Sequence, residues 1–190
     1  MADTFCLISV PDYIQQGCGS EKGGIVALGF IAPSVEIDED DLSATLENAA
    51  WWTGDINTSP STRHVVLNTR GTKAAGTTVE EDGYGLNLVE RTGDDKELTF
   101  EALGVIDNRD FWAAMNKRRG WGFVYVTSGQ NDDGDYNAFY APNVSVYADE
   151  AIDQPINSRI RWSGSAKWTT DLTPSKPFAF PADVITQLSE

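Results

Sequence analysis

Alternating apolar and polar positions, the pattern of half-buried β-strands, recur along most of the chain. The clearest segment is 121–127, which places Trp121, Phe123 and Tyr125 on one side and small or β-branched residues on the other. Further strands are expected at residues 5–10, 25–31, 63–69, 79–91, 97–106, 136–147 and 160–168. This pattern predicts a mainly β protein.

One segment with helical periodicity interrupts the strands, and we expect a short helix over residues 108–119. Asp107 or Asn108 can cap it, because a side-chain oxygen accepts a hydrogen bond from a free first-turn amide. Gly120 provides a left-handed stop. The expected apolar stripe is Phe111, Trp112 and Met115, and the basic residues Lys117, Arg118 and Arg119 complement the negative end of the helix dipole. We therefore predict a β-sandwich or rolled barrel with this helix packed over the core.

The segments that connect these elements have weaker patterns. Residues 42–52 have leucines spaced for one helix face, although a long polar loop is the rival interpretation. Thr-Gly-Asp-Asp at 92–95 predicts a turn that joins the strands 79–91 and 97–106 into a hairpin. The small residues of 70–77 predict a mobile hairpin tip.

The chain changes character at Asp171, after which three prolines occur between positions 174 and 181. Proline has no backbone N–H to donate, so this stretch is not expected to be a central strand. We predict a β-sandwich domain over 1–170 and an extended, proline-rich C-terminal arm over 171–190, with a short turn of helix at 182–188.

The charge of the 190-residue chain is strongly acidic, with a formal net value of −15. Such a chain repels phosphate backbones and anionic membranes, which disfavours nucleic-acid binding. The charge serves solubility alone, a surface that must not adhere to DNA, or a surface that pairs with a basic partner. No apolar run approaches the roughly 20 residues of a membrane span, and no signal peptide is recognised at the N-terminus. Cys6 and Cys18 are expected to be free thiols of a protein made in the cytoplasm.

Candidate chemistry is sparse. His64 is the single histidine, and no Gly-x-Ser-x-Gly elbow is present. The acidic segment 131–135 resembles a calcium loop but lacks its distal glutamate, so a plain turn is expected. The glycine-rich segment 17–24 lacks the spacing of a P-loop. We therefore expect no catalytic residue, no metal and no cofactor, and a protein that is not an enzyme; an enzyme that uses acidic residues alone is the remaining alternative.

An aromatic pair, Trp51 and Trp52, indicates a different function. Neighbouring rings on a loop can expose a face on which a sugar stacks. The alternative prediction is therefore a β-sandwich binding module, such as a capsid decoration protein or a glycan-binding protein.

Four segments in the middle and late parts of the chain carry a family resemblance: Ile106–Trp112, Trp121–Thr127, Arg161–Gly164 and Lys167–Trp168. In these the chain resembles the tail-tube proteins of tailed bacteriophages and the related neck-ring or connector proteins. Among them it is most similar to virion components of short-tailed, crAss-like phages.

The resemblance implies a virion structural protein, assembled in the host cytoplasm, that forms rings or a tube of identical subunits around a DNA channel. DNA would pass without specific binding, no membrane would be involved, and the partners would be copies of the chain and neighbouring virion proteins. Arg70 and Lys73 in the predicted loop, and Phe178 and Phe180 in the predicted arm, are then the expected inter-subunit contacts.

Overall fold

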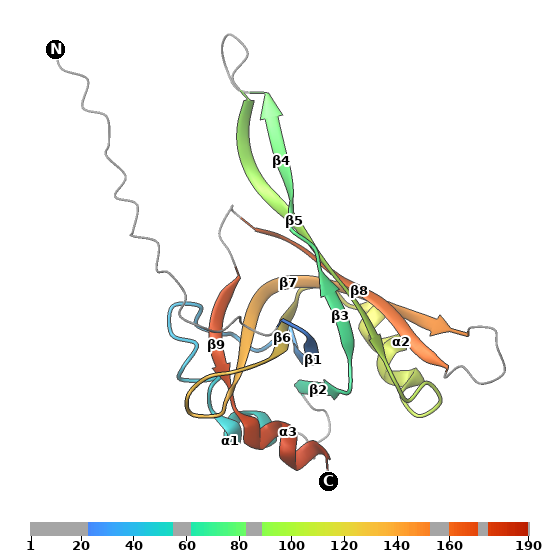
Figure 1. Ribbon diagram of the computed structural model, residues 1–190. Coiled ribbons are helices and arrows are strands. Elements are labelled where there is room, and N and C mark those ends of the chain that lie inside the picture. Colours follow the sequence, from blue (N-terminus) through green and yellow to red (C-terminus); the bar gives the residue numbers. More distant parts are fainter. Residues whose placement is uncertain (1–22, 55–61, 83–88, 153–159, 171–174, 190) are drawn as a thin grey trace.

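The computed structural model describes residues 23–54, 62–82, 89–152, 160–170 and 175–189, which form nine strands and three short helices (Figure 1). In chain order these are β1 (Ile25–Ile31), α1 (Ala49–Thr53), β2 (Arg63–Leu67), β3 (Arg70–Lys73), β4 (Thr77–Asp82), β5 (Val89–Ala102), α2 (Arg109–Lys117), β6 (Trp121–Gln130), β7 (Tyr136–Ala151), β8 (Arg161–Thr170), β9 (Lys176–Phe180) and α3 (Ala182–Ser189). The predicted strand 5–10, Cys6 and Cys18 lie outside the described residues.

The strands pair antiparallel in the order β2-β1-β6-β7-β8-β5-β3, while β4 pairs with β5 and β9 pairs with β7. The long strand β7 divides the sheet in two. Its first half pairs with β6 and β9, and together with β1 and β2 these form the first sheet. Its second half pairs with β8, and together with β3, β4 and β5 these form the second sheet. The predicted mainly β, sandwich-like fold with a short helix is thus confirmed.

Two hydrophobic cores lie on the two faces of the first sheet, because β6 contributes buried residues to both. Trp121, Phe123 and Tyr125 belong to the core shared with the second sheet and α2. Val124 and Val126 belong to the other core, to which α1, β9 and α3 also contribute buried residues. The two-sided alternation predicted for 121–127 is therefore confirmed, and it explains why the first sheet is covered on both sides.

Helix α2 packs on the first of these cores, as predicted. The Trp112 ring is 1% exposed and packs against Phe30, Phe100 and Trp162. The amide of Asn116 on the same helix donates to the Ala148 carbonyl (2.8 Å) and accepts from its N–H (2.9 Å). These two hydrogen bonds satisfy backbone groups of β7, as a neighbouring strand would.

The start of α2 differs from the expected cap. Asn108 occupies the N-cap position, but its side chain makes no capping hydrogen bond and donates to the Gly104 carbonyl (2.9 Å). The left-handed backbone expected at Gly120 is present, with φ of +80°.

The predicted turn at 92–95 is wrong, because β5 runs through it without a break. The strand pairing shifts between Val79 and Glu80, opposite Gly93 and Arg91, so that Thr92 is the additional residue of a bulge. A Cβ atom at Gly93 would lie 3.1 Å from the Thr170 carbonyl oxygen on β8. Glycine here allows close packing of two strands and does not mark a chain reversal.

Two other connections also differ from expectation. Residues 70–73 of the predicted mobile tip form β3, which pairs with β5. The helix predicted over 42–52 covers only Ala49–Thr53. Leu42 and Leu46 are buried all the same, on hydrogen-bonded turns that precede α1.

The described part of the predicted C-terminal arm is not an extended arm. Residues 176–180 form β9, which pairs with β7 beside Pro177, and 182–189 form α3. This strand lies off the main strand order, which is compatible with the missing N–H of Pro177. The segment was expected to be an extended arm because of its prolines; Phe178, Phe180 and Val184 are nonetheless buried in the second core.

Candidate functional site

The residues with catalytic or metal-binding potential do not converge. No group of three or more His, Cys, Asp or Glu residues able to hold a metal occurs among the residues that the structure describes. The ring of His64 lies on β2 and packs edge-on against Phe111, with centroids 5.2 Å apart. The acidic segment 131–135 forms the expected turn, in which Asn131 Oδ1 accepts from the backbone N–H groups of Asp133 and Asp135.

The expected exposed aromatic pair is wrong. Trp52 is fully buried, and its Nε1 donates to the Leu46 carbonyl (2.9 Å). Trp51 is partly buried and carries the guanidinium of Arg63 4.2 Å above its ring. The two rings meet edge to face at 88°, so they form no flat platform for a sugar.

The four residues expected at subunit contacts separate into two pairs. Phe178 and Phe180 are buried in the second core, where Phe180 packs 5.2 Å from Trp52, so their predicted role as exposed contacts is wrong. Arg70 is exposed and Lys73 is partly buried, both on β3. Burial, with a smaller contribution from the charge of Lys96, lowers the pKa of the Lys73 amine.

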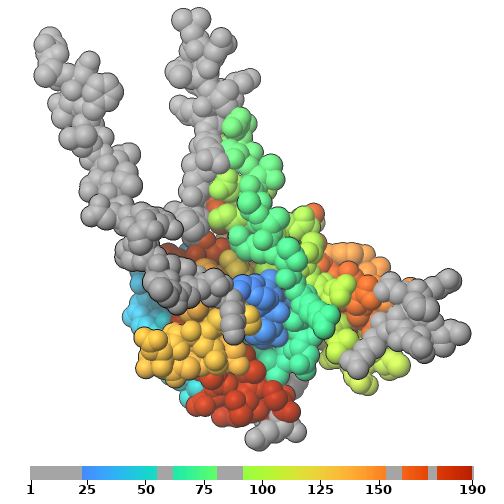
Figure 2. Space-filling model, in the orientation of Figure 1, coloured from blue at the N-terminus to red at the C-terminus, as the bar shows by residue number. Residues whose placement is uncertain are grey.

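The feature that departs most from a compact shape is the hairpin of β4 and β5, which stands clear of the body (Figures 1 and 2). With 14 residues, β5 is about 45 Å long at the usual rise of a strand. Its far half, with β4, extends past the other strands. The paired residues of this far half are strongly acidic: Glu80, Glu81, Asp82 and Glu90, against the single base Arg91.

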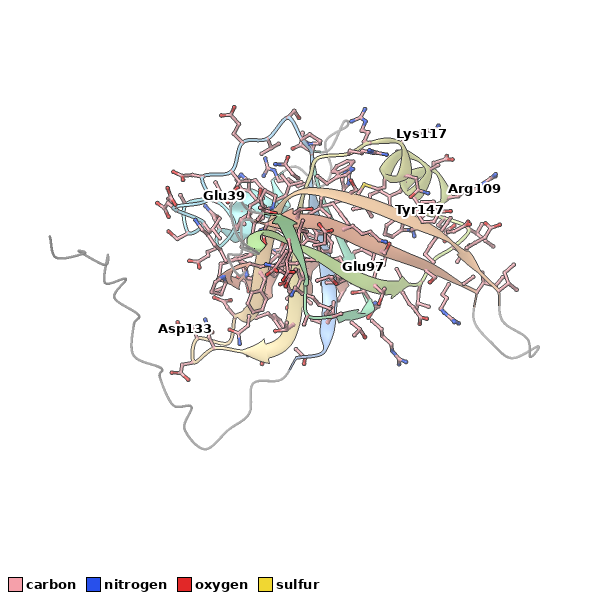
Figure 3. The ribbon with its side chains drawn as sticks, turned by 90° about the horizontal axis from the view of Figure 1, so that it is seen from above. Glu39, Glu97, Arg109, Lys117, Asp133 and Tyr147 are labelled. Atoms are coloured by element: carbon pink, nitrogen blue, oxygen red, sulfur yellow. The ribbon has the colours of Figure 1, made fainter. Side chains whose placement is uncertain are left out.

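A broad concavity of about 920 Å³ lies at the base of this hairpin. One wall is the β3–β4 connection at 74–77, and the opposite wall is the end of α2 with Arg118 and Arg119. The floor consists of residues from three neighbouring strands of the second sheet: Asp95 and Glu97 of β5, Ser165, Lys167 and Thr169 of β8, and Ser145 and Tyr147 of β7. Figure 3 marks Glu97, Tyr147 and, at the end of α2, Lys117.

Some charged groups in this concavity have partners among the described residues and others do not. Lys167 pairs with Glu97 at 3.2 Å, and Asp95 accepts from the Thr169 hydroxyl at 2.6 Å. Arg118 and Arg119 are exposed, and their guanidinium groups have no ion pair within the described part of the chain. In a protein with a net charge of −15, this concavity offers two available cations.

Sequence reasoning missed this concavity. The signal was the run Lys117–Arg119, which the helix dipole explained sufficiently by itself. The strands that form the floor come together only through the register in which Glu97 faces Lys167, and Lys167 faces Ser145.

Comparison with known proteins adds no relative: no family model, curated protein or solved structure matches the chain. Among the described helices, none has both the length and the apolar character needed to cross a bilayer.

Proposed function

We propose that this protein is a non-enzymatic structural subunit that assembles with copies of itself into a ring or tube around a DNA channel, as in the tail or neck of a bacteriophage particle. In this proposal it acts in the virion, is assembled in the host cytoplasm, and has neighbouring virion proteins as further partners. DNA passes without specific binding.

The observation that carries the proposal is the projecting β4–β5 hairpin. A compact monomer gains nothing from a ribbon that stands clear of its core, because no described side chain of β4 belongs to either hydrophobic core. Two-stranded ribbons are marginal in water by themselves. A neighbouring subunit that contacts the ribbon would supply the missing burial.

The charge supports the same proposal. A conduit for DNA must not retain it, and acidic walls repel the phosphate backbone. The net charge of −15 also opposes association of identical subunits, so assembly requires specific local contacts.

Native mass spectrometry and negative-stain electron microscopy of the full chain, over a range of protein concentrations, test this proposal. We expect closed rings or stacked rings with one dominant subunit number. A protein that stays monomeric at the highest soluble concentration, in low and in physiological salt, would contradict the proposal. Tight binding of duplex DNA at physiological salt would contradict the proposed passage of DNA through a channel.

A further inference from the structure

Beyond the proposed function, we propose that the concavity bounded by Arg118 and Arg119 binds an acidic oligosaccharide, a short chain of sugars that carries carboxylate or sulfate groups. The two arginines hold the acidic group, and the outer face of the second sheet holds the sugar rings and their hydroxyls. With about 920 Å³, the concavity has the volume of a ligand site. It lies on other elements than Trp51 and Trp52.

The floor of the concavity is the outer face of three paired strands. Successive side chains point to opposite faces of a strand, and Ser145 and Tyr147 belong to the exposed set of β7. Their register partners on β8 are Lys167 and Ser165. Strand β8 also pairs with β5 on its other side, so the middle of the floor has no open strand edge. A ligand here therefore contacts side chains, most of which carry hydroxyl or charged groups.

Tyr147 provides the surface on which a sugar ring stacks (Figure 3). It is 59% exposed, and of the large apolar residues exposed in the described ranges it alone lines the concavity. Its hydroxyl donates to the Asp149 carboxylate at 3.4 Å, which helps to orient the ring. A flat aromatic face bordered by polar groups suits a sugar ring, which has an apolar face and a rim of hydroxyls.

The charge of the lining favours a ligand with a few negative groups. The lining includes four basic and two acidic residues: Lys96, Lys167, Arg118, Arg119, Asp95 and Glu97. The sum of four positive and two negative charges is +2, in a chain with a net charge of −15. Because Arg118 and Arg119 have no ion pair with any described residue, they are available to a ligand. Guanidinium groups bind carboxylate and other oxyanions through paired, charge-assisted hydrogen bonds.

The same lining disfavours two other anionic ligands. Nucleic acid carries a phosphate at every nucleotide, and Asp95 and Glu97 on the floor repel such a dense series of charges. Peptides are commonly bound along an open strand edge or in an apolar groove, and the floor offers neither. Carboxylates do suit a sugar, because their oxygens accept hydrogen bonds from hydroxyl groups.

Calorimetric titration of the full chain tests this proposal with three acidic probes: tetragalacturonate, sialyllactose and a carrageenan tetrasaccharide that carries only sulfate groups. Their neutral counterparts are methyl-esterified tetragalacturonate, lactose and the desulfated tetrasaccharide. We expect at least one acidic probe to bind with a Kd of about 0.1–1 mM. Loss of its acidic group should weaken binding more than about tenfold. The first and third probes distinguish carboxylate from sulfate recognition.

Arg118→Gln/Arg119→Gln tests the wall of the concavity. This variant should bind the acidic probe more than about tenfold more weakly, because both guanidinium groups are lost. Its preference for that probe over the neutral counterpart should disappear, which a general loss of structure would not produce. Arg109→Gln/Lys117→Gln is the matched control, since it removes the same charge from the same helix at positions outside the lining (Figure 3). The control should bind within about twofold of the unaltered chain.

Tyr147→Ala tests the stacking surface. Loss of the ring should weaken binding of the acidic probe about threefold to tenfold. Tyr147→Phe keeps the ring and removes only the hydroxyl, so it should bind within about twofold of the unaltered chain. Circular dichroism of every variant establishes that the fold is retained.

The outcomes keep this inference apart from the proposed function. Failure of all three acidic probes to bind at millimolar concentration contradicts the inference, and so does binding that Arg118→Gln/Arg119→Gln leaves unchanged. Tight binding of a short DNA duplex that this variant abolishes would make the concavity a nucleic-acid site, and the inference would be wrong. A chain that binds an acidic probe but stays monomeric contradicts the proposed function alone.

Discussion

Strand β6 of the first sheet and the β4–β5 hairpin of the second sheet are opposite extremes of burial. The first six residues of β6 are buried, and they supply side chains to a core on each face. The described side chains of β4 are exposed or half-buried, and none reaches a core. The body is therefore stabilised by its own buried residues, whereas the described side chains of β4 add to neither core, and in the proposed assembly a neighbouring subunit would contact them.

The strongest test of this contrast is Trp112→Ala in the body. The ring is 1% exposed and contacts aromatic residues from both sheets. Its removal should lower the free energy of unfolding by about 3–5 kcal/mol, because it leaves a large cavity. Denaturant unfolding measures the loss. Ile106→Ala, at a side chain that is 86% exposed, is the control and should change stability by less than about 0.5 kcal/mol. A small effect at Trp112 would mean that α2 does not close the core.

A second test of the body adds volume instead of removing it. A Cβ atom at Gly164 would lie 2.5 Å from the Tyr147 carbonyl oxygen and 2.7 Å from the Phe100 ring. Gly164→Ala should therefore destabilise the protein by about 2–3 kcal/mol, as overpacking does. Gly23→Ala, where nothing lies within 4 Å of the new atom, should be nearly neutral in the same unfolding measurement. Equal stability of the two variants would show that β7 and β8 can separate without cost.

The body was the more predictable region, because local patterns determine it. Alternation in 121–127 identified both faces of β6, and the apolar stripe of 108–119 identified the buried side of α2. These signals are strong because each residue's environment repeats with the period of its own element.

Elsewhere the sequence underdetermined the result. Trp51 and Trp52 are the same residue type, so hydrophobicity cannot tell them apart. Trp52 is fully buried in the second core, whereas Trp51 is only partly buried against it. Gly93 has the composition of a turn but permits a close strand contact. The concavity was invisible for the same reason: it depends on strand register between distant segments, and Arg118 and Arg119 had an adequate local explanation.

A smaller effect in the body concerns pH. Burial, with a contribution from the charge of Glu39, raises the pKa of Tyr140 to about 12. The folded state therefore holds this proton more tightly than the unfolded chain does. The stabilisation is complete below pH 10 and is lost as the pH rises toward 12.

Tyr140→Phe isolates that effect. The unaltered protein should lose stability between pH 10 and 12 more steeply than the variant, by on the order of 1 kcal/mol. Unfolding at several pH values measures the difference, and absorbance of tyrosinate should show one fewer late-titrating group in the variant. Parallel pH profiles for the two proteins would mean that Tyr140 titrates as in the unfolded chain.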